Sequence, residues 1–163
     1  MISRRHTPIP PGPGQESVWD YPRPPRVEVM NQRVTIELAG VTLVDTTDVV
    51  RVLETSHPPA YYVPRGAFAS GSLAPVPGIT HCEFKGAASY LSVGGVDRAG
   101  WFYPRPLPGY ESLADRVCVY PGAMDRCTVD GETVVAQEGD FYGGWITSNI
   151  VGPFKGAPGT WGW

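Results

Sequence analysis

The stretch Val34-Thr35-Ile36-Glu37-Leu38-Ala39-Gly40-Val41-Thr42-Leu43 indicates the fold class, because apolar and polar residues alternate along it on both sides of Gly40. A period of two places one face of a β-strand in a core and the other face in water. Val27 and Val29 alternate in the same way upstream, and Asn31-Gln32-Arg33 is typical of a turn. This part of the chain therefore predicts three short strands with one buried face.

A short helix is expected directly after these strands, near residues 46–56. Thr46-Thr47-Asp48 supplies a hydroxyl cap and an acid in the first turn. The apolar residues that follow fit one helical face, and Pro58-Pro59 would end the helix because neither proline can continue it.

The remainder of the chain predicts more strands and one hairpin. Asp130-Gly131 between two short apolar runs is a strong hairpin signal. Residues 66–78 are rich in Gly, Ala, Ser and Pro and are expected to form a loop. Strands are expected at residues 60–63, 80–84, 87–93, 116–120 and 126–129.

Length and composition favour one mainly β domain, built as a strongly bent sheet or a small barrel. The chain has 163 residues, a size typical of a single domain. Glycine (20) and proline (18) are abundant, but 42% of residues are hydrophobic, so we expect a turn-rich fold rather than disorder. Residues 1–25 form a Pro-rich arm, and residues 26–163 form the domain with a Trp- and Gly-rich tail.

Charge, hydropathy and cysteine spacing limit the partners, the location and the cofactors that we expect. The net charge is −3 and no segment concentrates Lys or Arg, so a nucleic-acid partner is not expected. No apolar run approaches the length of a membrane span, and no apolar segment follows Arg4 and Arg5, so a cytoplasmic location is expected. Cys82, Cys118 and Cys127 lack zinc-ligand spacing, so neither a metal nor another cofactor is expected.

Two stretches concentrate chemically versatile side chains. Residues 53–65 hold a carboxylate, an imidazole, two phenols and a guanidinium on a backbone stiffened by three prolines. Residues 82–90 add a thiol, another carboxylate, an ammonium and another phenol. A simple turn does not require this mixture, so we expect the scaffold to bring the two stretches together as one site.

The charged residues have two interpretations each. Glu54 is a candidate general acid or base, with Lys85 beside it. Arg65 suits an anionic ligand group as a planar fork, and Lys85 suits it as a point charge. The alternative for Glu54 is a solvated helix position or a structural ion pair with Arg65 or Lys85. The alternative for the two cations is ion pairing with Glu54 and Glu83. His57 is either a proton-transfer group or a cap on the end of the expected helix.

The thiol and the aromatic residues also have two interpretations each. Cys82 is either a ligand contact beside Lys85 or a buried strand residue. The aromatic residues are either core or the lining of a cleft, in which their rings would stack on a planar ligand. The aromatic candidates are Tyr61, Tyr62, Tyr90, Trp101, Tyr103 and Trp145.

These motifs resemble a family of unknown function, the domain-of-unknown-function (DUF) family 427, which also carries a nucleotidyltransferase-style label. The resemblance extends roughly from residue 18 to the end of the chain and implies a compact, mainly β domain. It is carried by Leu53-Glu54-Thr55, Pro58-Pro59, Tyr61-Tyr62-Val63-Pro64-Arg65, Cys82, Phe84-Lys85-Gly86-Ala87, Ser89-Tyr90, residues 99–104, Pro106-Leu107 and Val129-Asp130-Gly131.

Three functions are compatible with this pattern. The first is a small-molecule-binding protein whose aromatic and charged pocket is built by residues 53–65 and 82–90. The second is a small enzyme that uses Glu54 as acid or base, with Arg65 and Lys85 binding an anionic, nucleotide-related substrate. The third is a structural homo-oligomer.

Overall fold

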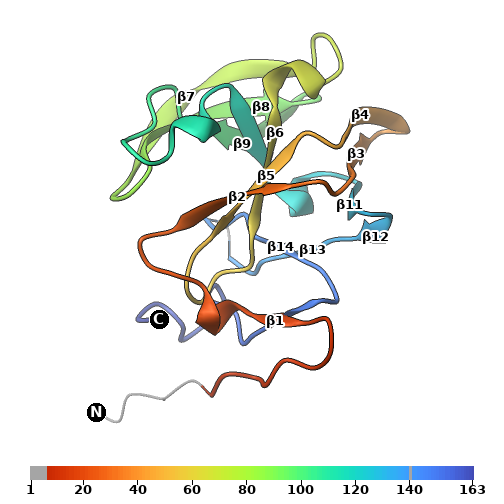
Figure 1. Ribbon diagram of the computed structural model, residues 1–163. Coiled ribbons are helices and arrows are strands. Elements are labelled where there is room, and N and C mark those ends of the chain that lie inside the picture. The colour runs from red at the N-terminus through yellow and green to blue at the C-terminus, as the bar shows by residue number, and fades with distance from the viewer. Residues whose placement is uncertain (1–6, 140) are drawn as a thin grey trace.

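The computed structural model describes residues 7–139 and 141–163, and the described chain is dominated by short strands (Figure 1). The only helical elements in these ranges are four 3-10 turns of three residues, η1 (Val18–Asp20), η2 (Arg65–Ala67), η3 (Glu111–Leu113) and η4 (Pro121–Ala123). The strands are β1 (Glu16–Ser17), β2 (Arg26–Met30), β3 (Val34–Leu38), β4 (Val41–Thr46), β5 (Val49–Leu53), β6 (Ala60–Pro64), β7 (Leu73–Cys82), β8 (Gly86–Val93), β9 (Val96–Phe102), β10 (Arg116–Val119), β11 (Arg126–Val129), β12 (Glu132–Thr133), β13 (Val135–Ala136), β14 (Trp145–Ile146) and β15 (Ile150–Val151).

Two antiparallel sheets form the body of the protein. The larger has seven strands in the order β2-β5-β6-β10-β9-β8-β7, and the smaller has four in the order β12-β11-β3-β4. The hairpin at Asp130-Gly131 joins β11 to β12, as expected. The mainly β class is therefore confirmed. The barrel alternative is not formed, because β2 and β7 remain the two edges of an open sheet in the described residues.

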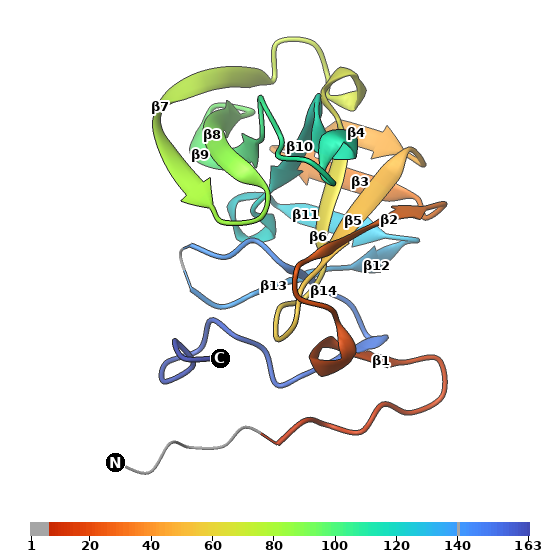
Figure 2. The same ribbon diagram turned by 60° about the vertical axis from the view of Figure 1, so that its left-hand side comes forward.

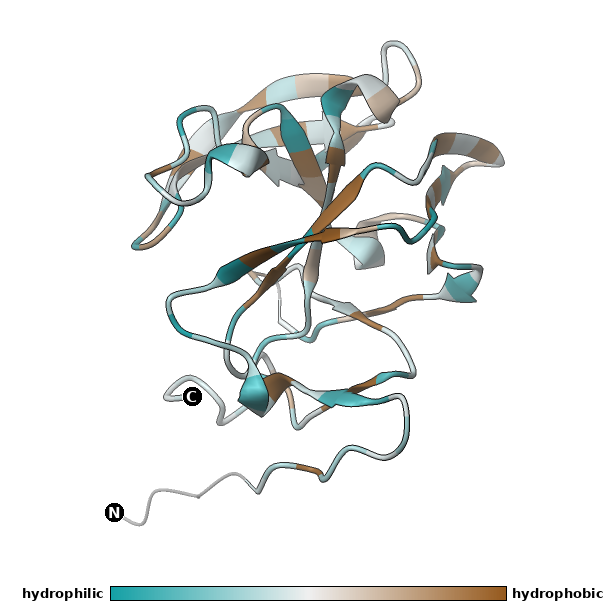
Figure 3. Ribbon diagram, viewed as in Figure 1, coloured by the Kyte–Doolittle hydropathy of each residue, from teal (hydrophilic) through white to brown (hydrophobic). Residues whose placement is uncertain are grey.

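The central strands of the large sheet are buried on both faces, and consecutive residues belong to different cores. On β6, Tyr61 packs in the core shared with the small sheet, whereas Tyr62 packs in a second core on the opposite face. Val117 and Cys118 on β10 divide in the same way. Successive side chains of a strand point to opposite faces of the sheet, so adjacent residues must pack in different cores. Figure 3 shows the hydrophobic residues concentrated on β5, which runs through the middle of the molecule.

The face that carries the second core is concave. Val50 and Val52 on β5 lie in one apolar cluster with Ala88 and Tyr90 on β8, although three strands separate β5 from β8 in the sheet. A flat sheet would hold these strands too far apart for contact, since neighbouring strands are spaced by about 4.8 Å. The sheet is therefore strongly bent, and its concave face provides the hollow in which the candidate site lies.

The prediction of a helix near residues 46–56 is wrong. Thr46 ends β4, and Val49–Leu53 form β5, which pairs with β2 and β6 and is buried at all five positions. A short apolar run fits a buried strand as well as a helix, and three β-branched valines favour the strand. The expected polar face is absent because Arg51 is buried too, paired with Glu16 and Glu28 at 2.6 and 2.9 Å.

The prediction of a loop at residues 66–78 is also wrong for the second half of that range. Strand β7 begins at Leu73 and pairs with β8 over most of its ten residues. Its register shifts between Val76 and Ile79, where Pro77 and Gly78 interrupt the pairing. Prolines are tolerated here because β7 is an edge strand, whose outer N–H groups need no sheet partner.

The N-terminal arm packs along the C-terminal segment, and both views show the two lying side by side (Figures 1 and 2). Strand β1 pairs in parallel with β15, and the Ile9 N–H donates to the Gly152 carbonyl at 2.9 Å. The Trp19 indole donates to the Pro153 carbonyl at 3.0 Å. Residues 1–6 of the expected arm, including Arg4 and Arg5, lie outside the described residues. No helix in the described ranges has the length and apolarity to cross a membrane.

Candidate functional site

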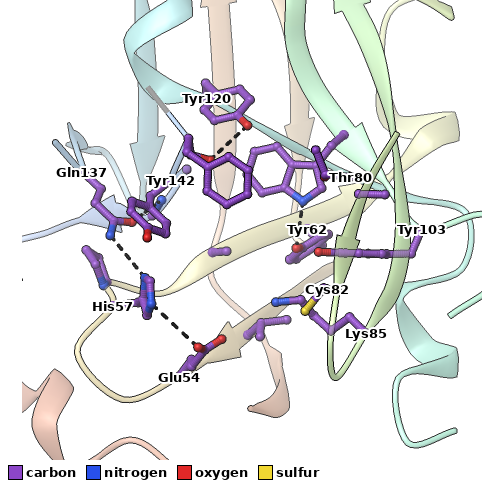
Figure 4. A pocket seen from close by; sticks show the side chains of 18 of the residues that line it. Glu54, His57, Tyr62, Thr80, Cys82, Lys85, Tyr103, Tyr120, Gln137 and Tyr142 are labelled. Carbon is purple, nitrogen blue, oxygen red and sulfur yellow. Dashed lines mark hydrogen bonds and ion pairs between the residues drawn. The ribbon is translucent and has the colours of Figure 1, made fainter. Parts of the chain in front are cut away.

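A cavity of about 300 Å³ opens on the concave face of the large sheet (Figure 4). Its walls come from strands β5 to β9, from the residues that directly follow β5, β7, β9 and β10, and from the C-terminal segment that starts at residue 137. The residues lining it are Val52, Glu54, His57, Pro58, Ala60, Tyr62, Thr80, His81, Cys82, Lys85, Ala88, Tyr90, Trp101, Tyr103, Tyr120, Gln137, Phe141, Tyr142, Gly143, Gly144 and Lys155.

Aromatic rings form the deep wall of the cavity. The Trp101 indole lies 4.7 Å from the Tyr120 ring at an interplanar angle of 51°, and it meets the Tyr62 ring edge-to-face at 6.2 Å. Its Nε1–H donates to the Tyr62 hydroxyl at 3.1 Å, while Tyr103 lies 6.4 Å from Tyr62. Burial raises the pKa of the Tyr62 and Tyr103 hydroxyls well above their usual value, so both remain protonated. The surface of this wall is therefore mostly apolar ring, and the Tyr62 hydroxyl and the Trp101 indole N–H are held in place by their hydrogen bond.

The wall next to Trp101 depends on two glycines in the C-terminal segment. A Cβ atom on Gly143 would lie 2.2 Å from the Trp101 indole, and one on Gly144 would lie 2.6 Å from the Gln137 amide oxygen. Any larger residue would collide at these positions, so the backbone approaches Trp101 directly. The glycines thus set the width of the cavity.

Gln137 fixes the tautomer of His57. The Gln137 oxygen accepts from the Gly144 N–H at 3.0 Å, which leaves its Nε2 amide as a donor. That amide donates to the Lys155 carbonyl at 2.6 Å and lies 3.3 Å from His57 Nδ1. His57 Nδ1 must therefore accept, so the proton of the neutral ring is on Nε2. This N–H is directed to the Glu54 side of the cavity (Figure 4).

His57 is neutral at physiological pH. Burial, reinforced by the positive charges of Lys155, Lys85 and Arg23, lowers the pKa of its imidazole to about 4. The 3.7 Å separation between His57 Nε2 and Glu54 is consequently a polar contact rather than an ion pair at neutral pH. The ionic partner of Glu54 is Arg23, at 3.6 Å.

The 82–90 stretch supplies the other charged wall. Lys85 occupies the turn between β7 and β8, with its ammonium 5.8 Å from the centre of the Tyr103 ring. Tyr90 on β8 shares a 2.9 Å hydrogen bond with Thr80 on β7, which joins the two strands of that hairpin at the cavity. Figure 4 shows Cys82 and Lys85 across the open space from Glu54 and His57.

Seven of the nine residues expected at the site line this cavity, and they come from both predicted stretches. The seven are Glu54, His57, Tyr62, Cys82, Lys85, Tyr90 and Trp101.

Tyr61 and Arg65 are not part of the cavity. Tyr61 lies on the other face of β6, with its hydroxyl 3.3 Å from the Gln32 side chain and its ring 5.2 Å from Trp145. Arg65 follows β6 into a 3-10 turn and places its guanidinium 4.5 Å from the centre of the Phe102 ring. Trp145 also packs in the core and not in the cavity.

Sequence reasoning missed Tyr120, which follows β10, and the contribution of the C-terminal segment. Tyr120, Gln137, Tyr142 and Lys155 all line the cavity but lie outside both stretches. One signal was available: Gly143-Gly144 directly before a tryptophan indicates close backbone packing. The described residues contain no group of three or more His, Cys, Asp or Glu side chains placed to hold a metal ion.

Comparison with known proteins identifies the family. The pattern of the family described as Domain of unknown function (DUF427) matches residues 26–130, which is more than half of the chain. The protein therefore belongs to this family, although the match is shorter than the range from residue 18 onward that the motifs indicated. No curated protein matched the chain.

Proposed function

We propose that this member of the DUF427 family binds a small planar molecule in the cavity on the concave face of its sheet. The observation that carries the proposal is the aromatic wall around Trp101, in which the Tyr62, Tyr103 and Tyr120 rings are fixed at defined angles. Small-molecule sites are typically concave, mostly aromatic or apolar, and supplied with a few oriented polar groups. A volume of about 300 Å³ suits a ligand of one or two fused rings.

The proposal can be tested by screening planar fragments against Trp101→Leu. Wild-type protein is expected to be stabilised by flat aromatic compounds in a thermal-shift assay, with stoichiometric binding by calorimetry. Trp101→Leu should lose this binding, because the stacking of one planar ring on an aromatic side chain is worth about 1–3 kcal/mol. Trp161→Leu is the matched control, since Trp161 is 75% exposed and outside the cavity. Equal affinities in wild type and Trp101→Leu would contradict the proposal.

A second candidate function is acid–base catalysis by Glu54. The observation that favours it is the neutral His57 N–H placed 3.7 Å from the Glu54 carboxylate at the cavity wall. His57 is a poor base in this arrangement because its lone pair is occupied by Gln137. Glu54 is then the proton acceptor, with Lys85 on the facing wall. Turnover of a bound compound that disappears in Glu54→Gln, while binding persists, would establish an enzyme.

The cytoplasmic location, the absence of a nucleic-acid partner and the homo-oligomeric alternative stay predictions.

A further inference from the structure

The polar groups of the cavity are mainly hydrogen-bond donors. Lys85 and Lys155 contribute ammonium groups, and His57 contributes its Nε2–H because Gln137 occupies Nδ1. Burial raises the pKa of the Tyr62, Tyr103 and Tyr120 hydroxyls, so these three groups keep their protons. A ligand that fills such a site must be rich in acceptors, because a buried donor without a partner costs about 1–3 kcal/mol.

The positive charge of Lys85 is not neutralised by a neighbouring carboxylate of the described residues. Among the residues that the structure describes, Lys85 has no carboxylate within 4.0 Å, and its one ring contact is with Tyr103. Lys155 donates to the main-chain oxygen of Trp163 at 3.1 Å and lies 5.7 Å from the Tyr142 ring. Lys85 is therefore the ammonium with the most unused hydrogen-bonding capacity.

Among the residues that the structure describes, Glu54 is the one carboxylate that lines the cavity, and it is already engaged. Arg23 lies 3.6 Å from it on the outer side, and His57 lies 3.7 Å away. Glu54 and Arg23 cancel as a pair, so the remaining charge of the described lining residues is positive. The low pKa of His57, caused after burial by Lys155, Lys85 and Arg23, is a second sign of this positive potential.

We infer that the ligand is a planar aromatic anion, whose ring stacks on Trp101 and whose carboxylate or phosphate group is held by the Lys85 ammonium. This inference rests on the proposed function and names its ligand class. The rival is an aromatic cation, which rings of this kind also recognise. Two ammonium groups in the same lining oppose it, because like charges in a partly buried site repel.

The test compares four probes with the same bicyclic ring: 2-naphthoate, 2-naphthyl phosphate, neutral 2-naphthamide and cationic 2-naphthylmethylammonium. Isothermal titration calorimetry at pH 7 measures the Kd of each. At least one anion is expected to bind about tenfold or more tightly than the amide, as a charge-assisted hydrogen bond allows. The cation is expected to bind most weakly. The preferred anion identifies the headgroup.

Lys85→Met should reduce the affinity for the anion to that of the amide and leave amide binding unchanged. Arg105→Met is the matched control, because it removes the same unit of charge from an exposed position outside the cavity. An amide or cation that binds as tightly as both anions would overturn the inference while leaving the proposed function intact. Failure of all four probes to bind would overturn both. A loss of anion affinity in Arg105→Met equal to that in Lys85→Met would also overturn the inference, because it would reflect net charge alone.

Discussion

Gln137 determines what His57 can do, although 80 residues separate them in the chain. The amide of Gln137 is held in one orientation by the Gly144 N–H and the Lys155 carbonyl. A histidine free in solution exchanges between two neutral tautomers, and this contact selects the one with its proton on Nε2. The selection turns a versatile residue into a fixed donor that faces the cavity.

The depressed pKa of His57 predicts a loss of stability in mild acid. In the unfolded chain the imidazole binds a proton below about pH 6.5, whereas in the folded protein it does so only below about pH 4. Between these values the unfolded state holds the extra proton, so the free energy of unfolding falls as pH falls, by up to about 1.4 kcal/mol per pH unit. Urea unfolding at pH 7, 6 and 5 measures this slope.

His57→Gln provides the comparison for that slope. The groups that face His57 are Glu54, Gln137, Tyr142 and the cations Lys85, Lys155 and Arg23. All of them remain in the variant, so the difference in slope between the two proteins belongs to His57. A wild-type slope no steeper than that of His57→Gln between pH 7 and 5 would show that the imidazole is not destabilised in its charged form.

At the scale of elements, the segment around Gly143 acts as a wall that tolerates no side chain. It directly precedes β14, lies against Trp101 of the aromatic wall, and is buried at Gly143 and Gly144. The width of the cavity is therefore a property of the sequence of the C-terminal segment, which lies beyond the family match at residues 26–130.

Gly143→Ala is expected to close the cavity without removing any existing side chain. The new methyl group would overlap the Trp101 indole, so the ring or the segment must shift. Overpacking of this kind costs about 1–3 kcal/mol of stability. Affinity for planar fragments should fall at least as much as in Trp101→Leu. Gly66→Ala is the control, because a Cβ there has no neighbour within 4 Å. Undiminished fragment binding in Gly143→Ala would argue against Trp101 as the binding surface.

At the scale of the whole molecule, the N-terminal arm completes the fold from outside the large sheet. Val18 and Tyr21 are buried in a cluster with Leu53 and Ile150. Glu16 pairs with Arg51, which is buried in the middle of β5. The arm thus supplies both apolar contacts and one of the two carboxylates that neutralise a buried guanidinium.

Deleting residues 1–24 is expected to lower the Tm by on the order of 10 °C. The deletion removes a buried apolar cluster and leaves Arg51 with a single carboxylate, and breaking a buried ion pair costs about 3–5 kcal/mol. Glu16→Gln in the full chain isolates the ionic part, and differential scanning calorimetry measures both variants. A Tm unchanged by the deletion would mean that the arm contributes nothing to the stability of the body.

Local patterns were sufficient for the class of fold and for much of the candidate site. Alternation at Val34, Ile36 and Leu38 predicted strands because the period of side-chain direction is a property of the backbone itself. The same patterns could not separate a helix from a strand at residues 49–53, because an entirely buried run has no polar face to reveal its period.

The sequence by itself determined the strand-rich class and the two stretches that supply Glu54, His57, Cys82 and Lys85. Only the tertiary structure decided which side chains share a cavity. Tyr62 enters it and Tyr61 does not, because adjacent residues of a strand face opposite sides and the bend of the sheet makes just one side concave. Gln137 and Lys155 enter because the C-terminal segment folds back across that side, a contact fixed by long-range packing and not by local spacing.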